Sequence, residues 1–344
     1  MLSFSELVRT IGPYGGYKLA SKLTRSYPRI LMYHRFSMKG GSGSLSKGML
    51  ERQFSYLKEN FDVLSLSDAL SECDSPISKK KPIVSLTIDD GYRDFYEFCF
   101  PLLKKYEFPA TFYVATDFVG QGIWLWHDKL KWIIDSNSVI SESLYIKEHK
   151  YTPEYWCNNK DTLWRDLVSV MLRMSGEEIE NILDKLSFLT KAKIPESPTA
   201  DYCSVSWAEL REMQAARVSI GGHTKSHYSL GHLSVGDVKS QVLGCRDHLS
   251  HELGEQSRHF CFPNGQPADI TGSAKAMVKS AGFESAVAAY YDKSGVTDRF
   301  SMSRHGVGES WFEFQKSVWG IDRLGAQLFN RNSTFDWGEV CPQK

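Results

Sequence analysis

The feature that most constrains the fold of this chain is a set of short apolar segments that carry no charge. Two examples are Ile83-Val84-Ser85-Leu86-Thr87-Ile88 and Ala110-Thr111-Phe112-Tyr113-Val114. Neither alternates between apolar and charged residues, as a strand with one wet face would. Stretches with apolar residues at helical spacing lie between such segments, for example Phe95, Phe98 and Leu102. The alternation predicts an α/β fold with a parallel sheet buried on both faces.

Two groups of chemically active residues follow predicted strands directly. Asp89 and Asp90 come after the first apolar segment, and His223 and His227 come after the short strand expected at Val218-Ser219-Ile220. Parallel α/β barrels assemble their sites at the C-terminal ends of their strands, so we expect the four side chains to meet. A carboxylate and two imidazoles suit a catalytic zinc ion, with cobalt, nickel or manganese as alternatives. The second carboxylate is then free to act as a base.

Local geometry supports this grouping. An extended chain would send Asp89 and Asp90 to opposite faces, but Gly91 can form a turn that brings both toward one pocket. His223 and His227 are four residues apart, which in a helix would point both rings the same way.

Five motifs in this order resemble the polysaccharide deacetylases, also called the NodB-homology family or carbohydrate esterase family four. They are Leu31-Met32-Tyr33-His34-Arg35, Leu86-Thr87-Ile88-Asp89-Asp90-Gly91-Tyr92, Ala110-Thr111-Phe112-Tyr113-Val114, Gly222-His223-Thr224-Lys225-Ser226-His227 and Phe260-Cys261-Phe262-Pro263-Asn264-Gly265. The resemblance covers roughly residues 28–300 and implies a distorted (β/α)7 TIM-like barrel with a helical insertion. It also implies that Asp89 is the general base and that Asp90, His223 and His227 are the metal ligands.

The third family motif normally carries an Arg that braces the base, and here Cys261 occupies that position. Arg258 and Arg304 are the candidates to replace it. By the same resemblance, the backbone near Asn264 and Gly265 is expected to receive the oxyanion, because any residue except Pro can supply the N–H.

The general acid has two candidates. The family's last motif offers a His after a strand, and the nearest match here is Phe300-Ser301-Met302-Ser303-Arg304-His305, which favours His305 and leaves Arg304 beside the substrate. His34, which ends the apolar part of the motif Leu31-Met32-Tyr33-His34-Arg35, is the second candidate. Trp207 is expected to form a wall of the substrate pocket.

The chain divides into four predicted parts. Residues 1–27 form an N-terminal helical segment, residues 28–119 and 200–305 form the barrel, residues 120–199 form a Trp-rich helical insertion, and residues 306–344 form a C-terminal extension. Ser175 is expected to cap a helix of the insertion.

Composition limits the classes of binding partner and the cellular location that we expect for this protein. The chain has 41 basic and 41 acidic residues, which disfavours a nucleic-acid-binding surface. Seven scattered cysteines without a Cys-x-x-Cys spacing indicate reduced thiols and a cytoplasmic protein. The first 26 residues lack the apolar core of a signal peptide or a transmembrane segment, but their basic, partly amphipathic character leaves room for peripheral membrane contact.

The expected activity is therefore metal-dependent removal of an N-acyl group, N-acetyl above all, from an amino sugar. The substrate would be a small amino-sugar compound, a sugar nucleotide, a lipid-linked sugar or a glycan. Two alternatives stay open: a deformylase or other small-amide hydrolase of the same superfamily, and a catalytically inactive carbohydrate-binding module.

Overall fold

The computed structural model describes residues 12–41, 43–73, 81–136, 139–158, 160–291 and 295–329. Part of the predicted N-terminal segment (residues 1–11) and part of the C-terminal extension (residues 330–344) lie outside the described residues.

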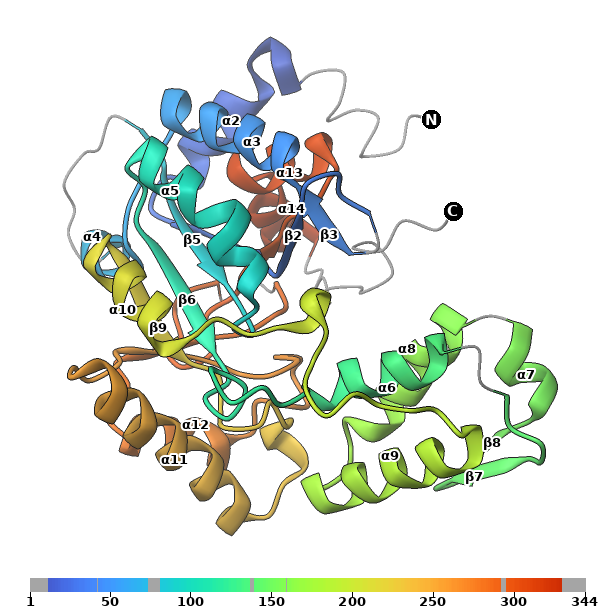
Figure 1. Ribbon diagram of the computed structural model, residues 1–344. Helices are drawn as coiled ribbons and strands as arrows, with labels where there is room; N and C mark the ends of the chain where they lie inside the picture. The colour runs from blue at the N-terminus through green and yellow to red at the C-terminus, as the bar shows by residue number, and fades with distance from the viewer. Residues whose placement is uncertain are drawn as a thin grey trace.

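A curled sheet of parallel strands forms the centre of the molecule (Figure 1). Its strands lie in the order β11-β10-β9-β6-β5-β1-β12, and β4 pairs with β5 at the side of this path. Their bounds are β1 (Arg29–Tyr33), β4 (Asp62–Val63), β5 (Ile83–Ile88), β6 (Ala110–Val114), β9 (Val218–Gly222), β10 (His259–Cys261), β11 (Ser285–Val287) and β12 (His305–Gly306). Every residue of β1, β5 and β6 is buried, which explains their uninterrupted apolar sequences.

One segment closes this sheet into a barrel. Met302 pairs with Val287 of β11 in a parallel bridge, and three residues later His305 of β12 pairs with Leu31 of β1. The segment 302–306 therefore joins the last strand of the sheet to the first. The predicted (β/α)7 TIM-like barrel is confirmed.

Helices cover the outside of the barrel (Figure 1). Between the strands lie α3 (Lys47–Asn60), α4 (Leu66–Cys73), a π-helical turn η2 (Phe95–Cys99) that continues into α5 (Phe100–Tyr106), α10 (Trp207–Ala215), α11 (Val235–Leu253) and α12 (Gly272–Ser280). Short 3-10 turns η3 (Ala200–Tyr202) and η4 (Leu230–His232) precede α10 and α11, and β2 (Arg35–Ser37) pairs with β3 (Ser44–Ser46) beside β1.

The chain leaves the barrel after β6 and forms a separate lobe (Figure 1). This lobe, which we call the insertion lobe, contains α6 (Trp126–Asp135), β7 (Leu144–Ile146), β8 (His149–Tyr151), α7 (Pro153–Asn158), α8 (Lys160–Met171) and α9 (Gly176–Thr190). It has its own apolar core, in which Leu130, Leu163 and Leu183 are fully buried. Ser175 caps α9 in a capping box with Glu178, as predicted.

Helices from both ends of the chain pack near each other. They are η1 (Gly12–Gly16) and α2 (Tyr17–Leu23) at the start, and α13 (Trp311–Val318) and α14 (Ile321–Phe329) at the end. Tyr17 stacks on Trp319 at a centroid distance of 6.1 Å. Within the described ranges, no helix is both long and apolar enough to cross a bilayer.

Candidate active site

Asp90, His223 and His227 converge beyond the C-terminal ends of β5 and β9. His223 Nε2 and His227 Nε2 lie 3.3 Å and 3.1 Å from the same oxygen, Asp90 Oδ1. All three side chains are buried. Their donor atoms lie close enough together to hold one metal ion. The structure thus brings together the three residues expected to be metal ligands.

The backbone reaches this arrangement through left-handed residues rather than through a helix. Asp90 has φ 81°, Thr224 has φ 65° and His227 has φ 60°. The expectation that His223 and His227 lie one turn apart on a helix is wrong, because the loop after β9 reverses direction at Thr224. Such conformations cost about 1–3 kcal/mol each in non-glycine residues and persist where the surroundings determine them. Here neighbouring strands do so: His223 N–H donates to Val114 O, and Ala115 N–H donates to Asp90 O.

The Asp90 carboxylate is charged in this setting. Burial raises its pKa, but hydrogen bonds with His223 and His227 outweigh burial and hold the pKa well below its usual value. His223 Nδ1 lies 2.7 Å from the Cys261 carbonyl oxygen. In that contact Nδ1 is the donor to the carbonyl, so Nε2 is the ring atom that would bind a metal ion.

Asp89 forms a different set of contacts, although it is the next residue along the chain. Arg304 holds it with two parallel bonds, Nη1 to Oδ1 at 2.7 Å and Nη2 to Oδ2 at 2.6 Å. Burial raises the pKa of Asp89, but the Arg304 guanidinium outweighs it and the pKa lies below the usual value. Asp89 is therefore an ionised carboxylate that is fixed in orientation, as a general base must be.

Arg304 is the residue that replaces the Arg missing at Cys261. Its Nε donates to Ala288 O at 2.7 Å, and its Nη1 also donates to Thr87 Oγ1 at 3.1 Å. The side chain is 0% exposed and its hydrogen bonds stay within the protein, so this arrangement gives no support to the expectation that Arg304 contacts substrate. Arg258, the other candidate, is well exposed and forms its ion pair with Glu284.

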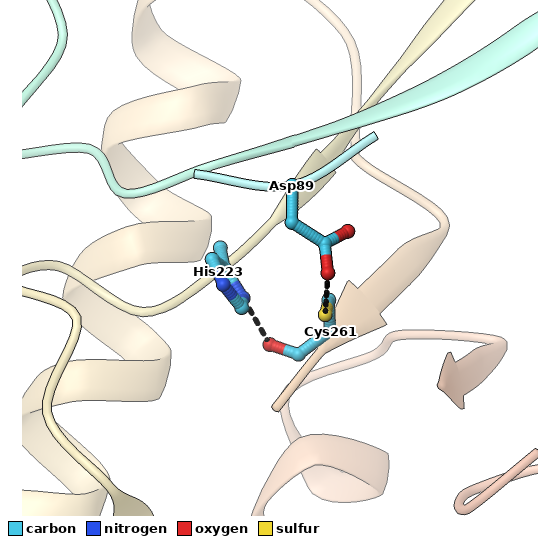
Figure 2. A group of neighbouring side chains, drawn as sticks. All are labelled: Asp89, His223 and Cys261. Carbon is cyan, nitrogen blue, oxygen red and sulfur yellow. Dashed lines mark hydrogen bonds between the residues drawn. The ribbon is translucent and has the colours of Figure 1, made fainter. Parts of the chain in front are cut away.

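A second group of potential ligands consists of Asp89, His223 and Cys261 (Figure 2). Figure 2 shows the Cys261 thiol directed at Asp89, with Sγ 3.5 Å from Oδ2, while the His223 ring faces the Cys261 carbonyl. Burial raises the pKa of this thiol well above its usual value, so it stays protonated and is a poor ligand. Both Asp89 oxygens are already bound by Arg304. The group around Asp90 is the better metal site.

The two candidates for the general acid lie in different places. His34 Nε2 is 3.6 Å from Asp89 Oδ2, and its side chain is 14% exposed, so the structure brings it to the site. His305 is buried on the other face of its strand, where Nδ1 is 3.5 Å from Asp322 Oδ2 and the ring stacks on Tyr291 at 4.3 Å. Arg304, the residue before β12, points to Asp89, whereas His305 points away from it to Asp322. The placement of His305 at the site is therefore wrong.

The loop after β10 carries Asn264 and Gly265, with φ 57° and 55°. Asn264 Nδ2 donates to Asp269 Oδ2 at 2.6 Å, and Asp269 also accepts from Ser229 Oγ at 2.5 Å in the loop that follows His227. Gly265 N–H donates to Pro263 O. In the described part of the chain the Asn264 N–H has no acceptor, so this backbone group is available to an oxyanion.

Trp207 does not join this group. It starts α10, packs against His248 at a centroid distance of 4.8 Å and lies over Gly120. Among the described residues, none of its ring contacts reaches the Asp and His side chains. The prediction that it forms a pocket wall has no support in this arrangement.

Three further residues border the site and were not predicted. The Tyr92 hydroxyl donates to Asp128 Oδ2 at 2.6 Å and lies 3.2 Å from His127 Nε2. The His127 ring lies 4.9 Å from the His227 ring. Burial raises the pKa of Asp128 to about 7. His127 and Asp128 belong to α6, so the insertion lobe contributes side chains beside the candidate metal ligands.

Comparison with known proteins gives a consistent result. The family model for polysaccharide deacetylase matches residues 77–286. The putative polysaccharide deacetylase YxkH of Bacillus subtilis is 31% identical over 103 residues, a stretch that spans 30% of this chain and 37% of that relative.

Solved structures share the fold at low identity. The Streptococcus pyogenes deacetylase PplD in complex with acetate has a TM-score of 0.54 at 16% identity, with 87% of this chain and 97% of that one covered. IcaB from Ammonifex degensii has a TM-score of 0.54 at 16% identity, over 86% and 97%. A de-N-acetylase from Aggregatibacter actinomycetemcomitans has a TM-score of 0.52 at 17% identity, over 85% and 99%.

The barrel of parallel strands, with carboxylates and histidines gathered at its strand ends, places the protein in the class of α/β barrels that carry a candidate metal site. The family match covers more than half of the chain, and this protein belongs to the polysaccharide deacetylase family.

Proposed function

We propose that this protein is a metal-dependent hydrolase that removes an N-acyl group, N-acetyl first among them, from an amino sugar. One observation carries the proposal: Asp89 and Asp90 are adjacent but have separate partners. Asp89 is held by a guanidinium and Asp90 by two imidazoles. Two carboxylates whose environments differ in this way can divide the roles of base and metal ligand.

The donor set fits a divalent ion. Asp90, His223 and His227 would hold it, and three N/O ligands without a thiolate suit catalytic zinc, with cobalt, nickel or manganese as alternatives. A divalent ion bound there polarises an amide carbonyl and lowers the pKa of water.

The chain's own residues supply the remaining steps of this mechanism. Asp89 takes a proton from the attacking water, and Arg304 keeps the carboxylate ionised and correctly oriented until then. The Asn264 backbone N–H stabilises the oxyanion that develops on the acyl carbonyl. His34 Nε2 lies 3.6 Å from Asp89 Oδ2, beside the proposed base, and His34 is the residue that protonates the leaving amine.

The alternative from another functional class, an inactive carbohydrate-binding module, has less support than the hydrolase. The alternative rested on the altered third and last family motifs. Arg304, just before β12, supplies the guanidinium that is missing at Cys261, and His34 lies beside Asp89 where His305 does not. The sugar, its carrier and the cytoplasmic location remain predictions.

An acyl-release assay tests the proposal. The substrates are N-acetylglucosamine oligomers, a nucleotide-linked N-acetyl sugar, a lipid-linked N-acetyl sugar and N-formyl analogues. We expect release of acetate from at least one N-acetyl sugar, its loss on chelation and its return on addition of zinc. Asp89→Asn is the matched variant, and it should bind zinc like the wild type but release no acetate. Chelator-insensitive release, or full activity of Asp89→Asn, would overturn the proposed mechanism, and preferred release of formate would favour the deformylase alternative.

A further inference from the structure

The insertion lobe makes a direct hydrogen bond to one of the metal-ligand residues. Trp126, the first residue of α6, donates its indole N–H to the His227 carbonyl oxygen at 3.1 Å. Trp126 is 3% exposed, so water does not compete for this bond. The bond joins residues 101 positions apart in the sequence and connects the lobe to the barrel beside the metal ligands.

His227 depends on such a contact because of its backbone conformation. Its φ of 60° is unfavourable for a residue with a side chain, and it follows the equally left-handed Thr224. Within its own loop, His227 N–H donates to Thr224 Oγ1 at 3.0 Å. The His227 carbonyl oxygen accepts the hydrogen bond from the Trp126 indole N–H. The two peptide groups that flank the His227 Cα, and so set the direction of its side chain, are thus each held by a hydrogen bond.

The two histidine ligands are held by different parts of the molecule. His223 is oriented by the barrel, through the Cys261 carbonyl at 2.7 Å. His227 is oriented by the insertion lobe, through Trp126 and through the His127 ring that packs against it. The first turn of α6 is in turn fixed by α8, because Trp164 donates its indole N–H to the His127 carbonyl at 3.0 Å.

We propose that Trp126 is a positioning residue for His227, and that the insertion lobe raises the affinity of the Asp90, His223 and His227 site for a divalent ion. This inference rests on the proposed function, because it takes these three residues as metal ligands. It extends that function by giving the lobe a role in metal binding in addition to any contact with substrate.

The test compares two Trp→Phe variants by their zinc affinity. Trp126→Phe keeps an aromatic ring but removes the bond to His227. Trp132→Phe is the matched control, because Trp132 is in the same helix and donates its indole N–H to the Lys193 carbonyl at 3.1 Å, away from the site. Zinc dissociation constants are measured on the full chain by competition with a chromogenic chelator.

We expect Trp126→Phe to weaken zinc binding about tenfold, the lower end of the loss seen when a contact that orients a metal ligand is removed. Trp132→Phe should bind zinc within about twofold of the wild type. Unchanged zinc affinity in Trp126→Phe, or an equal loss in both variants, would overturn the inference, since an equal loss would mean that the lobe was merely destabilised.

A measurement on the wild-type protein covers the case in which Trp126→Phe does not fold. In ¹⁵N-labelled protein, zinc should shift the indole N–H resonance of Trp126 and leave that of Trp132 in place, and an unshifted Trp126 resonance would contradict the inference. The two proposals fail separately. Wild-type protein that binds no zinc overturns both, whereas wild-type protein that binds zinc and releases acetate, together with unchanged affinity in Trp126→Phe, overturns only this one.

Discussion

The position of Arg304 beside Asp89 and Cys261 could be determined only from the folded structure. Sequence comparison of motifs leaves an arginine missing at Cys261 and a histidine displaced at His305. In the structure Arg304 directly precedes β12, and its Nη2 is 3.1 Å from the Cys261 Sγ, so the guanidinium occupies the space beside the thiol. The proposed base therefore keeps an arginine partner, although the position of that arginine in the sequence has changed.

Replacing Arg304 should damage both stability and turnover. Arg304→Gln leaves the buried Asp89 carboxylate without its partner, and we expect the free energy of unfolding to fall by about 3–5 kcal/mol and the acetate-release rate to fall with it. Denaturant unfolding and initial rates measure the two effects. The exposed Arg258 is the control, and Arg258→Gln should change stability by less than about 0.5 kcal/mol. Full activity in folded Arg304→Gln would refute the bracing role.

Matched substitutions of His34 and His305 distinguish the two candidates for the general acid. His34→Gln should lower kcat about 10²- to 10⁴-fold, because it removes the imidazole beside Asp89, while zinc binding stays intact. His305→Gln alters a buried ring that packs on Tyr291 away from the site, and folded protein should keep kcat within a few-fold. Steady-state kinetics at saturating zinc measure both. The reverse ranking would return the role to His305.

The core of the site was predictable from sequence because its residues lie in short motifs. Asp89, Asp90, His223 and His227 each follow an apolar strand, and parallel strands end at one edge. The inward position of Arg304 and the outward position of His305 were not predictable. A shift of one residue in strand register exchanges the two faces, and the apolar pattern around β12 is too short to fix the register.

At the scale of elements, β9 matters most because it delivers both histidines. Its last two residues are Gly221 and Gly222, which lie beyond the strand predicted at residues 218–220. A Cβ on Gly221 would lie 2.3 Å from the buried Tyr113 ring and 3.0 Å from the His259 carbonyl oxygen. The strand can therefore approach its neighbours only without a side chain there.

Gly221→Ala should destabilise the protein by about 1–3 kcal/mol, because the Tyr113 ring is buried and cannot move aside freely. Zinc affinity should fall as well, since His223 follows two residues later. Gly236→Ala is the control: its Cβ would meet only Ser234 Oγ at 3.7 Å, and alanine in helix α11 should be neutral or stabilising by about 0.5 kcal/mol. Thermal unfolding with and without zinc measures both, and equal stabilities of the two variants would contradict the close contact at Gly221.

At the scale of the whole molecule, the barrel class was predictable and the position of the insertion lobe was not. Alternating apolar strands and amphipathic helices indicate a parallel α/β barrel because few other folds bury strands on both faces. The contact of Trp126 with His227 depends on how the lobe docks on the barrel, and no local pattern encodes a hydrogen bond across 101 residues. The tryptophans of residues 120–199 (Trp124, Trp126, Trp132, Trp156 and Trp164) therefore indicated an insertion without revealing its contact with His227.

The stability of the whole barrel should decrease at mildly acidic pH through His259. This residue lies between Ser67 Oγ and Ser285 Oγ, each at 2.9 Å, and burial followed by the charge of Arg258 lowers its pKa to about 4. The unfolded chain takes up this proton near pH 6.5, whereas the folded chain does so only near pH 4. The unfolded state therefore binds more protons between these values, and about 3 kcal/mol of stability is lost as the pH falls from 6.5 to 4.

His259→Gln isolates this contribution. Denaturant unfolding between pH 4 and 7 should show a shallower loss of stability in the variant than in the wild type, whatever its absolute stability. Parallel curves for the two proteins would show that His259 titrates alike in the folded and unfolded states.

The central claim is that Asp90, His223 and His227 bind the metal while Asp89 stays with Arg304. Anomalous X-ray diffraction at the zinc edge, on crystals grown with zinc, tests it most directly. We predict one peak about 2.0–2.2 Å from an Asp90 oxygen, His223 Nε2 and His227 Nε2, with both Arg304 bonds to Asp89 retained. A peak among Asp89, His223 and Cys261, or no peak at either group, would contradict the account.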